Sequence, residues 1–335
     1  MALVFFGSGS FAVPSLEALA LSPSPPTLVI TRPDRPGRRG PKPVPTPVRQ
    51  KAIDLGLAVE APETANGPEF VERLRSLGPD LAIIVDYGEI LRETLRSVPR
   101  IGIFNLHASV LPRHRGAAPV VAALLAGDPQ TGVTLFRITK GLDAGPVTDI
   151  IRTPVDPLET AGELEDRLAL LGADLLLRNL ERLLSGRFDE EPQDDRLATL
   201  APKIPKGAGG IDWSLEVGPL AGFIRAMSPR PGAFGFLRRA GSSGAGVERM
   251  KILRAVPSAD PSAGPEAAHF PAPPGTVILA DGGVLRIACG SGGTGRIDIL
   301  EIQASGKAAL RTAEFLRGQR LRPGDAFDPA AQAAQ

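Results

Sequence analysis

This chain of 335 residues has little of what builds disulfides, metal clusters or membrane spans. Its one cysteine, Cys289, excludes an intramolecular disulfide and any zinc site made of several cysteines. No apolar run approaches the roughly 20 residues that a membrane helix needs, and the short apolar start has no basic region before it, so no signal peptide is predicted. We therefore expect a soluble cytoplasmic protein with no metal and no membrane association.

Charge is nearly balanced but unevenly distributed. The formal net charge is +1, with an excess of acidic residues up to residue 202 and an excess of basic residues after it. A second basic cluster lies early, where seven Lys and Arg residues accompany one Asp in the segment 32–51. Such asymmetry suggests a polyanionic partner, although an ordinary solvated surface fits the charge pattern equally well.

The first part of the chain alternates apolar runs with helical patterns, which is typical of an α/β fold with a mostly parallel sheet and flanking helices. Predicted strands cover residues 3–6, 27–31, 80–85, 101–106, 133–138 and 147–152, and predicted helices cover 14–20 and 68–77. The clearest helix, 160–185, begins with a capping box of Thr160 and Glu163 and ends before Gly186.

The periodicity changes after a polar, acidic stretch at 188–201. Short strands between Gly-rich turns are predicted at 233–238, 250–256, 276–279, 284–288 and 297–302, and a short helix at 312–317. Five such strands fit a C-terminal OB-like β-barrel, with the Pro-rich segment 257–274 as an insertion. The expected domains are an α/β domain at 1–187 that contains a basic loop at 32–49, a linker at 188–206, an OB-like domain at 207–327 and a tail at 328–335.

Three polar residues are the strongest candidates for chemistry. Asn105 and His107 lie two apart at the end of a predicted buried strand, so they share one face, and ligands bind at that end of open α/β sheets. Asp143 follows in a Gly-rich turn, where it can orient the imidazole and favour its charged form. A histidine at a strand end is more often structural than catalytic, but an amide, an imidazole and a carboxylate together suit acyl transfer to an amine.

Two other segments compete for a functional role. The segment Gly7–Ala12 formally matches a dinucleotide-binding fingerprint, but the next predicted strand ends in Arg32 where that fold needs an acidic residue. The Pro- and Arg-rich stretch 31–50 is an unusually long loop for a compact domain, and such loops are usually functional or disordered. Its basic side chains could bind phosphates, and an idle surface loop is the alternative.

The residues that surround these features resemble the bacterial methionyl-tRNA formyltransferases, within the folate-dependent formyltransferases, over nearly the whole chain. The matching segments are FAVPSLEAL (11–19), RPDRPGRRG (32–40), NLHASVLPRHRGAAP (105–119), TGVTLF (131–136), GLDAG (141–145), LATLAPKI (197–204), IDWS (211–214), PGTV (274–277) and FLRGQRLRPGD (315–325). The core around Asn105 and the GLDAG turn are specific to folate-dependent formyltransferases in general. The basic loop and the C-terminal segments narrow the resemblance to the tRNA enzymes.

The resemblance implies a one-carbon transferase of translation initiation that moves a formyl group from 10-formyltetrahydrofolate to the amino group of methionyl initiator tRNA. It places catalysis on Asn105, His107 and Asp143, and it needs no metal. The implied folate contacts are Ser109, Val110, Leu111 and Pro112. The implied tRNA contacts in the basic loop are Arg35, Arg38, Arg39 and Lys42. The basic character of the barrel adds Lys203 and Lys206. We expect a monomer, and formylation of a small amine such as an aminosugar nucleotide is the alternative.

Several positions depart from the family pattern. Asp86 stands where the segment usually reads AYG, and we interpret it as a solvated loop carboxylate beside the presumed folate site. Arg230 replaces the aromatic residue of the usual NPWPGA, and Ser8-Gly9 replace the second and third residues of the usual opening GTP. None of these positions belongs to the catalytic set.

Overall fold

The computed structural model describes residues 1–36, 43–241, 247–259 and 271–328. The chain folds into two compact units. The first unit comprises Met1–Pro119, Pro129–Val155 and Leu164–Pro202, and the second comprises Val120–Asp128, Asp156–Glu163 and Lys203–Gln335. The polar stretch after residue 187 therefore belongs to the first unit as far as Pro202.

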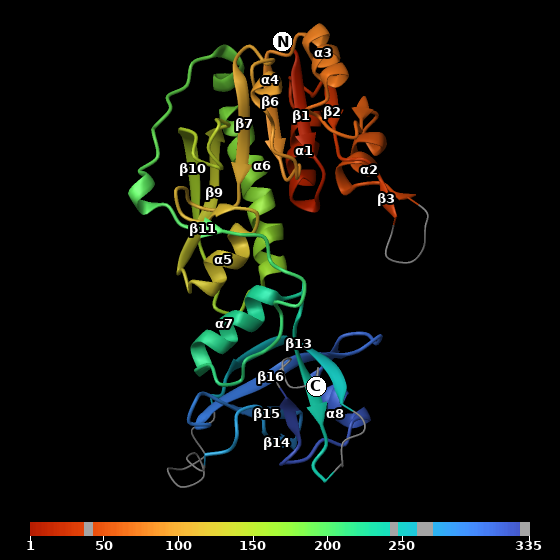
Figure 1. Cartoon of the computed structure of the whole chain (residues 1–335), viewed down its shortest axis with the longest axis vertical. Helices are drawn as coiled ribbons and strands as arrows, with labels where there is room; N and C mark the ends of the chain where they lie inside the picture. The colour runs from red at the N-terminus through yellow and green to blue at the C-terminus, as the bar shows by residue number, and fades with distance from the viewer. Residues whose placement is uncertain (37–42, 242–246, 260–270, 329–335) are drawn as a thin grey trace. The chain divides into compact units, whose positions relative to one another are not determined.

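A seven-stranded sheet in the order β10-β9-β7-β6-β1-β2-β5 forms the centre of the first unit (Figure 1). Its strands are β1 (Leu3–Gly7), β2 (Leu28–Ile30), β5 (Val59–Glu60), β6 (Leu81–Val85), β7 (Gly102–His107), β9 (Gln130–Arg137) and β10 (Val147–Pro154). Only β9 runs against its neighbours within this sheet. The predicted mostly parallel sheet is thus confirmed, and the carboxyl ends of β1, β6 and β7 lie next to one another.

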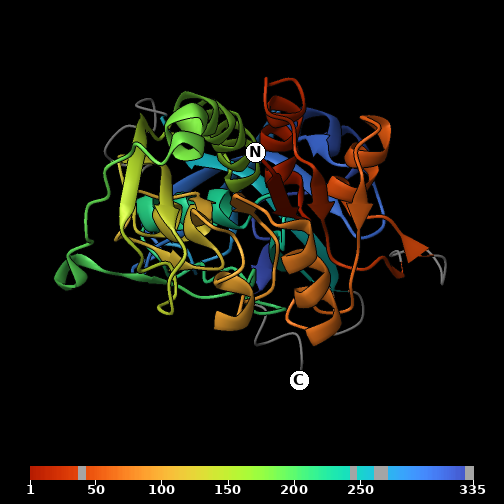
Figure 2. The same ribbon diagram turned by 90° about the horizontal axis from the view of Figure 1, so that it is seen from above.

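Helices cover both faces of this sheet, as Figure 2 shows for α6 (green) and α3 (orange) on opposite sides. The helical segments are η1 (Ser10–Ala12), α1 (Val13–Ala20), α2 (Pro47–Asp54), α3 (Pro68–Leu77), α4 (Glu93–Arg96), α6 (Ala161–Ser185) and η2 (Asp195–Leu197). Residues of α3 and α4 form one core with alternate residues of β1, β2 and β6. The predicted capping box opens α6, because the Glu163 side chain accepts from Thr160 N at 2.9 Å and Glu163 N donates to Thr160 Oγ1 at 3.4 Å.

A second, antiparallel sheet in the order β14-β15-β16-β13-β12-β18 forms the second unit, and the two-residue strand β17 pairs with β16. Its strands are β12 (Ala233–Arg238), β13 (Glu248–Pro257), β14 (Val277–Asp281), β15 (Val284–Cys289), β16 (Gly295–Ala304), β17 (Leu310–Arg311) and β18 (Ala326–Asp328). Register shifts in two of the pairings bend the sheet into a half-barrel. The OB-like fold is confirmed, with two short strands more than the five predicted.

Helix α7 (Val217–Met227) was not predicted from the sequence, and composition explains why. The segment contains Gly218, Pro219 and Gly222, all poor helix formers in isolation. The helix buries Leu220 and Ile224 in the apolar core of its own unit, so packing overrides propensity. The second unit also contains α5 (Pro119–Leu125), which belongs to it from Val120 onward, and α8 (Thr312–Gly318). The bounds of α8 agree with the helix predicted at 312–317.

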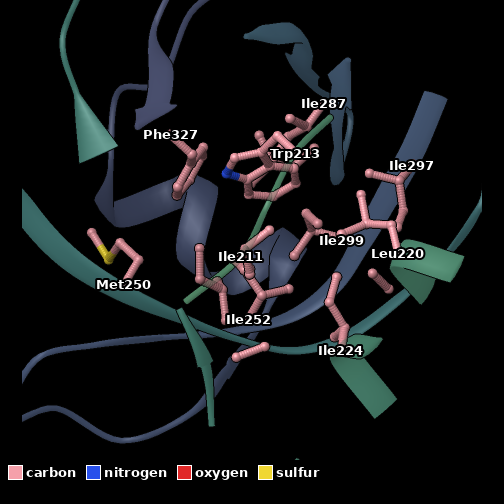
Figure 3. Packing of buried hydrophobic residues seen from close by; sticks show 14 of the residues in the cluster. Ile211, Trp213, Leu220, Ile224, Met250, Ile252, Ile287, Ile297, Ile299 and Phe327 are labelled. Carbon is pink, nitrogen blue, oxygen red and sulfur yellow. The ribbon is translucent and has the colours of Figure 1, made fainter. Parts of the chain in front are cut away.

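Figure 3 shows the core of the second unit, where branched aliphatic side chains surround Trp213. Trp213 packs against Phe327 with ring centroids 5.9 Å apart, and Ile252, Ile287 and Ile299 are almost completely buried around them. This core explains why the apolar alternation of the C-terminal strands was readable from the sequence. Within the described residues no helix is both long and apolar enough to cross a membrane, and no group of three or more His, Cys, Asp or Glu side chains could hold a metal ion.

Candidate active site

Asn105 and His107 lie at the carboxyl end of β7, as predicted. Asn105 pairs in register with Ile84 of β6 and Phe136 of β9, and His107 pairs with Thr134. Both side chains fall on the sheet face that carries Ile103, because residues two apart on a strand point the same way. The Asn105 side chain is partly buried, and its amide makes no hydrogen bond to any of the described residues. Its two N–H groups are therefore without a protein acceptor there.

The imidazole of His107 is buried, and its two nitrogens face different partners. Nε2 lies 2.8 Å from the carbonyl oxygen of His114, which can only accept, so Nε2 carries the proton in the neutral ring. Nδ1 lies 3.7 Å from Asp143 Oδ2, too far for a hydrogen bond but close enough for a strong Coulombic interaction. In the neutral ring Nδ1 therefore has a free lone pair beside a carboxylate.

Burial, more than charge, sets the protonation of this histidine. Removal from water lowers the pKa of His107 below its ordinary value of 6.5, while Asp143 and the bond to His114 O act in the opposite direction and the His114 ring adds a small lowering effect. Asp143 raises the pKa of His107, as expected, but burial lowers that pKa by more. The resting imidazole is accordingly neutral near pH 7.

Asp143 is fixed in an unusual backbone conformation. Its φ is 48°, in the left-handed region, and its Oδ2 accepts a hydrogen bond from Gly116 N at 2.8 Å. Gly145 closes the turn: a Cβ there would lie 1.8 Å from Arg137 O, so no other residue fits. Of the predicted catalytic residues, His107 and Asp143 thus lie side by side, and Asn105 shares the strand face of His107.

The segment Ser109–Pro112, predicted to contact folate, follows directly and is braced from β9. The buried hydroxyl of Thr134 donates to Ser109 O at 2.7 Å and accepts from Leu111 N at 3.1 Å. The Ser109 hydroxyl donates to Arg113 O at 2.6 Å, so it holds the loop rather than facing outward. Thr134 was not predicted as part of the site because a threonine in a strand has an ordinary structural explanation.

The segment after α6 packs against this site, which the sequence did not indicate. It forms the two-residue strand β11 (Leu200–Ala201), which pairs in parallel with β8 (Arg115–Gly116). Thr199 Oγ1 accepts from His114 N at 2.8 Å, and Thr199 O accepts from Arg115 N at 2.8 Å. The weak signal that could have revealed it is Gly116, whose φ of 129° and close approach to Ala201 O exclude a side chain.

Asp86 follows β6, two residues after the register partner of Asn105. Its carboxylate packs directly against Gly9, whose own N–H donates to Asp86 O at 3.2 Å. The residue retains solvent contact, yet the surrounding protein atoms and the Glu165 carboxylate raise the pKa of Asp86 to about 6. The interpretation as a loop carboxylate holds, although its environment disfavours the charged form.

The predicted tRNA contacts are placed only in part. Arg35 opens the two-residue strand β3 (Arg35–Pro36), which pairs with β4 (Pro43–Val44), while Lys203 and Lys206 are exposed at the start of the second unit. Arg38, Arg39 and Lys42 lie outside the described residues. The base of the basic loop is anchored by the hydroxyls of Thr31 and Thr46, 2.6 Å apart, and by the 2.8 Å ion pair of Arg49 with Asp34.

Comparison with known proteins identifies the family of this chain. A family model described as formyl transferase matches residues 1–180, and one described as the formyl transferase C-terminal domain matches residues 203–320. The methionyl-tRNA formyltransferase of Halorhodospira halophila is 41% identical over 323 residues, 96% of this chain and 98% of its own. The chain belongs to the methionyl-tRNA formyltransferase family. The relative from Aromatoleum aromaticum, 38% identical over 98% of both chains, supports the same assignment.

Solved structures of lower sequence identity share the fold. The sugar 3N-formyl transferase WlaRD, solved in the presence of dTDP and 5-N-formyl-THF, aligns with a TM-score of 0.63 at 18% identity and covers 92% of this chain and 99% of its own. HypX from Aquifex aeolicus, in complex with tetrahydrofolic acid, gives a TM-score of 0.58 at 16% identity over 94% of this chain and 47% of its own. At these identities the likeness concerns the fold alone.

Proposed function

We propose that this protein transfers a formyl group from 10-formyltetrahydrofolate to the α-amino group of methionyl initiator tRNA. The observation that carries the proposal is the meeting of an unpartnered amide, a buried neutral imidazole and a carboxylate at one strand edge within the described residues. It occurs in a chain that matches methionyl-tRNA formyltransferases over nearly its full length. We further propose that the reaction is cytoplasmic and that the enzyme acts as a monomer.

Asn105 serves as the oxyanion donor in this proposal. When the amine attacks the formyl carbon, a C–N bond forms and the formyl oxygen gains negative charge. The amide N–H groups of Asn105, which have no partner in the part of the chain that the structure describes, can donate to that oxygen. Such a donor is worth about 10²–10³-fold in rate.

His107 serves as the base, with Asp143 as its charged neighbour. Nδ1 accepts the proton that the attacking amine loses, and the imidazolium that results lies beside the Asp143 carboxylate. The same proton then passes to N10 of the departing folate as the old C–N bond breaks, so that protons balance. Because the neutral ring is required, kcat should fall as the pH is lowered through a value below 6.5.

The donor fits the residues that are present. The segment Ser109–Pro112, held by Thr134, follows β7 and has Val110 and Pro112 as partly exposed apolar groups. Bound there, the folate would supply an activated formyl group. The residues of the chain would orient it and handle the proton, and the roles of Ser109, Val110, Leu111 and Pro112 in binding it are part of the proposal.

The tRNA is recognised by charge in this proposal. Arg35, Arg38, Arg39 and Lys42 of the basic loop would meet the acceptor end, and Lys203 and Lys206 would follow the stem. Arg39→Ala should raise the KM for tRNA and leave that for folate unchanged. Because phosphate contacts release counterions, the KM for tRNA should also rise with salt, and a salt-insensitive value would count against these contacts.

The deciding experiment offers 10-formyltetrahydrofolate with three acceptors: charged initiator tRNA, charged elongator methionyl-tRNA and a small aminosugar nucleotide. We expect formylation of the first, much less of the second and none of the third. Preferential formylation of the sugar would replace this proposal by the small-amine alternative.

A further inference from the structure

Gln193, in the segment that follows α6, joins the two loops that complete the candidate active site. Its Nε2 donates to Asp143 O at 2.8 Å and to Gly145 O at 2.7 Å. Its Oε1 accepts from Arg115 Nε at 3.1 Å and from Arg115 Nη2 at 2.7 Å. One amide therefore binds the turn that carries Asp143 and, on its other side, the loop whose backbone fixes His107.

We propose that Gln193 is a positioning residue for formyl transfer, which sets the position of the Asp143 carboxylate relative to His107. This inference rests on the proposed function and adds to it a residue outside the catalytic trio. Gln193 touches neither His107 nor the Asp143 carboxylate, so it acts through the backbone of the Gly141–Gly145 turn.

The chemistry of the contacts requires an amide at this position. The two carbonyl oxygens of the turn can only accept hydrogen bonds, and the guanidinium of Arg115 can only donate them. Glutamine offers two donors and an acceptor in one planar group, and so satisfies both sides. A carboxylate would keep the bond to Arg115 but would repel both carbonyl oxygens.

Two features of the site depend on this bridge: the backbone conformation of Asp143 and the burial of Arg115. Asp143 has a left-handed backbone conformation, which needs support from its surroundings. Arg115 is buried at 8% exposure, and Asp195, with which its Nη2 forms a 2.7 Å ion pair, lies at the surface. Without Gln193 the turn loses two backbone hydrogen bonds and depends more on the bond from Gly116 N to Asp143 Oδ2. The carboxylate can then shift relative to His107, and a shift of about 1 Å can cost roughly 10²-fold in rate.

The charge on Asp143 provides a readout that a merely structural role would not move. Asp143 raises the pKa of His107, whereas burial and the His114 ring lower it. If the turn moves away, the raising effect weakens and the pKa of His107 falls further. The other titratable group that acts on this ring is His114, whose backbone N–H donates to Thr199 Oγ1 at 2.8 Å.

The test compares Gln193→Glu and Gln193→Met with a matched control, Arg196→Gln. Arg196 lies in the same segment, is exposed and forms its ion pair with Asp194 of that segment. NMR titration of the His107 ring in the full-length protein gives the pKa. Asp143→Asn provides the shift expected when the carboxylate charge is lost, and steady-state kinetics give kcat and KM.

We expect both Gln193 variants to lower the His107 pKa toward the Asp143→Asn value. They should reduce kcat by roughly 10–100-fold with a smaller change in the KM for tRNA, while Arg196→Gln matches wild type. Equal failure of the Glu and Met variants identifies donation to the turn as the required contact. An unchanged His107 titration in both variants, or wild-type turnover in Gln193→Glu, would overturn the inference. If the wild-type protein formylates none of the acceptors, the proposed function fails, whereas the titration still tests the positioning role.

Discussion

The candidate active site and the core of the second unit bury their residues in opposite ways. Six of the 13 buried polar residues in the described part of the chain fall between positions 107 and 134: His107, Ser109, His114, Arg115, Thr131 and Thr134. The core of the second unit packs Ile, Leu, Met and Phe side chains around Trp213 (Figure 3). One region is therefore held by directional hydrogen bonds and the other by close packing.

This contrast shows which substitutions each region tolerates. Close packing loses stability with every methylene removed, but neighbours of similar volume can substitute for one another. A buried polar network depends instead on donor and acceptor identity, because an unpaired buried group costs about 1–3 kcal/mol. Substitutions in the candidate active site should therefore mainly lower activity, and substitutions in the core of the second unit should mainly lower the free energy of unfolding.

The sharpest way to break the comparison is to remove the reacting groups. His107→Ala should lower kcat by about 10²–10⁴-fold because the base is lost, and Asn105→Ala by about 10²–10³-fold because the oxyanion donor is lost. Single-turnover formylation of charged initiator tRNA measures both. Circular dichroism and thermal melting should show folded proteins. Near-normal turnover in either variant would remove that residue from the mechanism.

The matching change in the second unit is Ile287→Ala. Ile287 is completely buried beside Trp213, so the cavity should lower the free energy of unfolding by about 2–5 kcal/mol. Denaturant titration followed by Trp213 fluorescence, the only tryptophan, reports on this unit directly. The His107 titration should stay at its wild-type value, and a shifted titration would mean that the two regions are coupled.

A substitution at the edge of the network sharpens the comparison. Thr134→Val keeps the shape of the side chain but leaves Leu111 N and its loop without their partner. The free energy of unfolding should fall by about 1–3 kcal/mol, and the KM for the folate donor should rise more than the KM for tRNA. Thr131→Val, also in β9 and buried, serves as the positional control because its side chain makes no hydrogen bond to the Ser109–Pro112 loop, all of which the structure describes. Equal effects of the two substitutions on folate would argue against the brace.

The smallest expected effect concerns Asp86. Its pKa in the folded protein is about 6, above the ordinary 3.8. Between these two pKa values the folded protein binds more protons than the unfolded chain. The free energy of unfolding of the wild-type protein therefore falls as the pH rises through this window, because Asp86 loses its proton in a site that disfavours the charge. Asp86→Asn should therefore be more stable than wild type above pH 6 and equal to it below pH 3.8. Chemical denaturation across this range would detect it, and a difference that does not vary with pH would contradict the assignment.

Much of the fold could be read from the sequence, because its signals are local and repeated. The strands β1, β6, β7, β9 and β10 have strong apolar runs, and the Thr160–Glu163 capping box marks where α6 begins. Among the elements that were not predicted, α7 contains two glycines and a proline, and β17 and β18 are too short to show alternation. Packing against the core of the second unit makes them ordered.

The site divides in the same way. The sequence alone determined that Asn105 and His107 share a strand end and that Asp143 follows in a glycine turn, since a period of two and an obligatory glycine are properties of short segments. Only the tertiary structure decided that burial outweighs the Asp143 charge in setting the pKa of His107, and that Gln193, which follows α6 in the chain, holds both loops. Desolvation and long-range hydrogen bonds depend on which distant atoms surround a group, and no local pattern of residues encodes that.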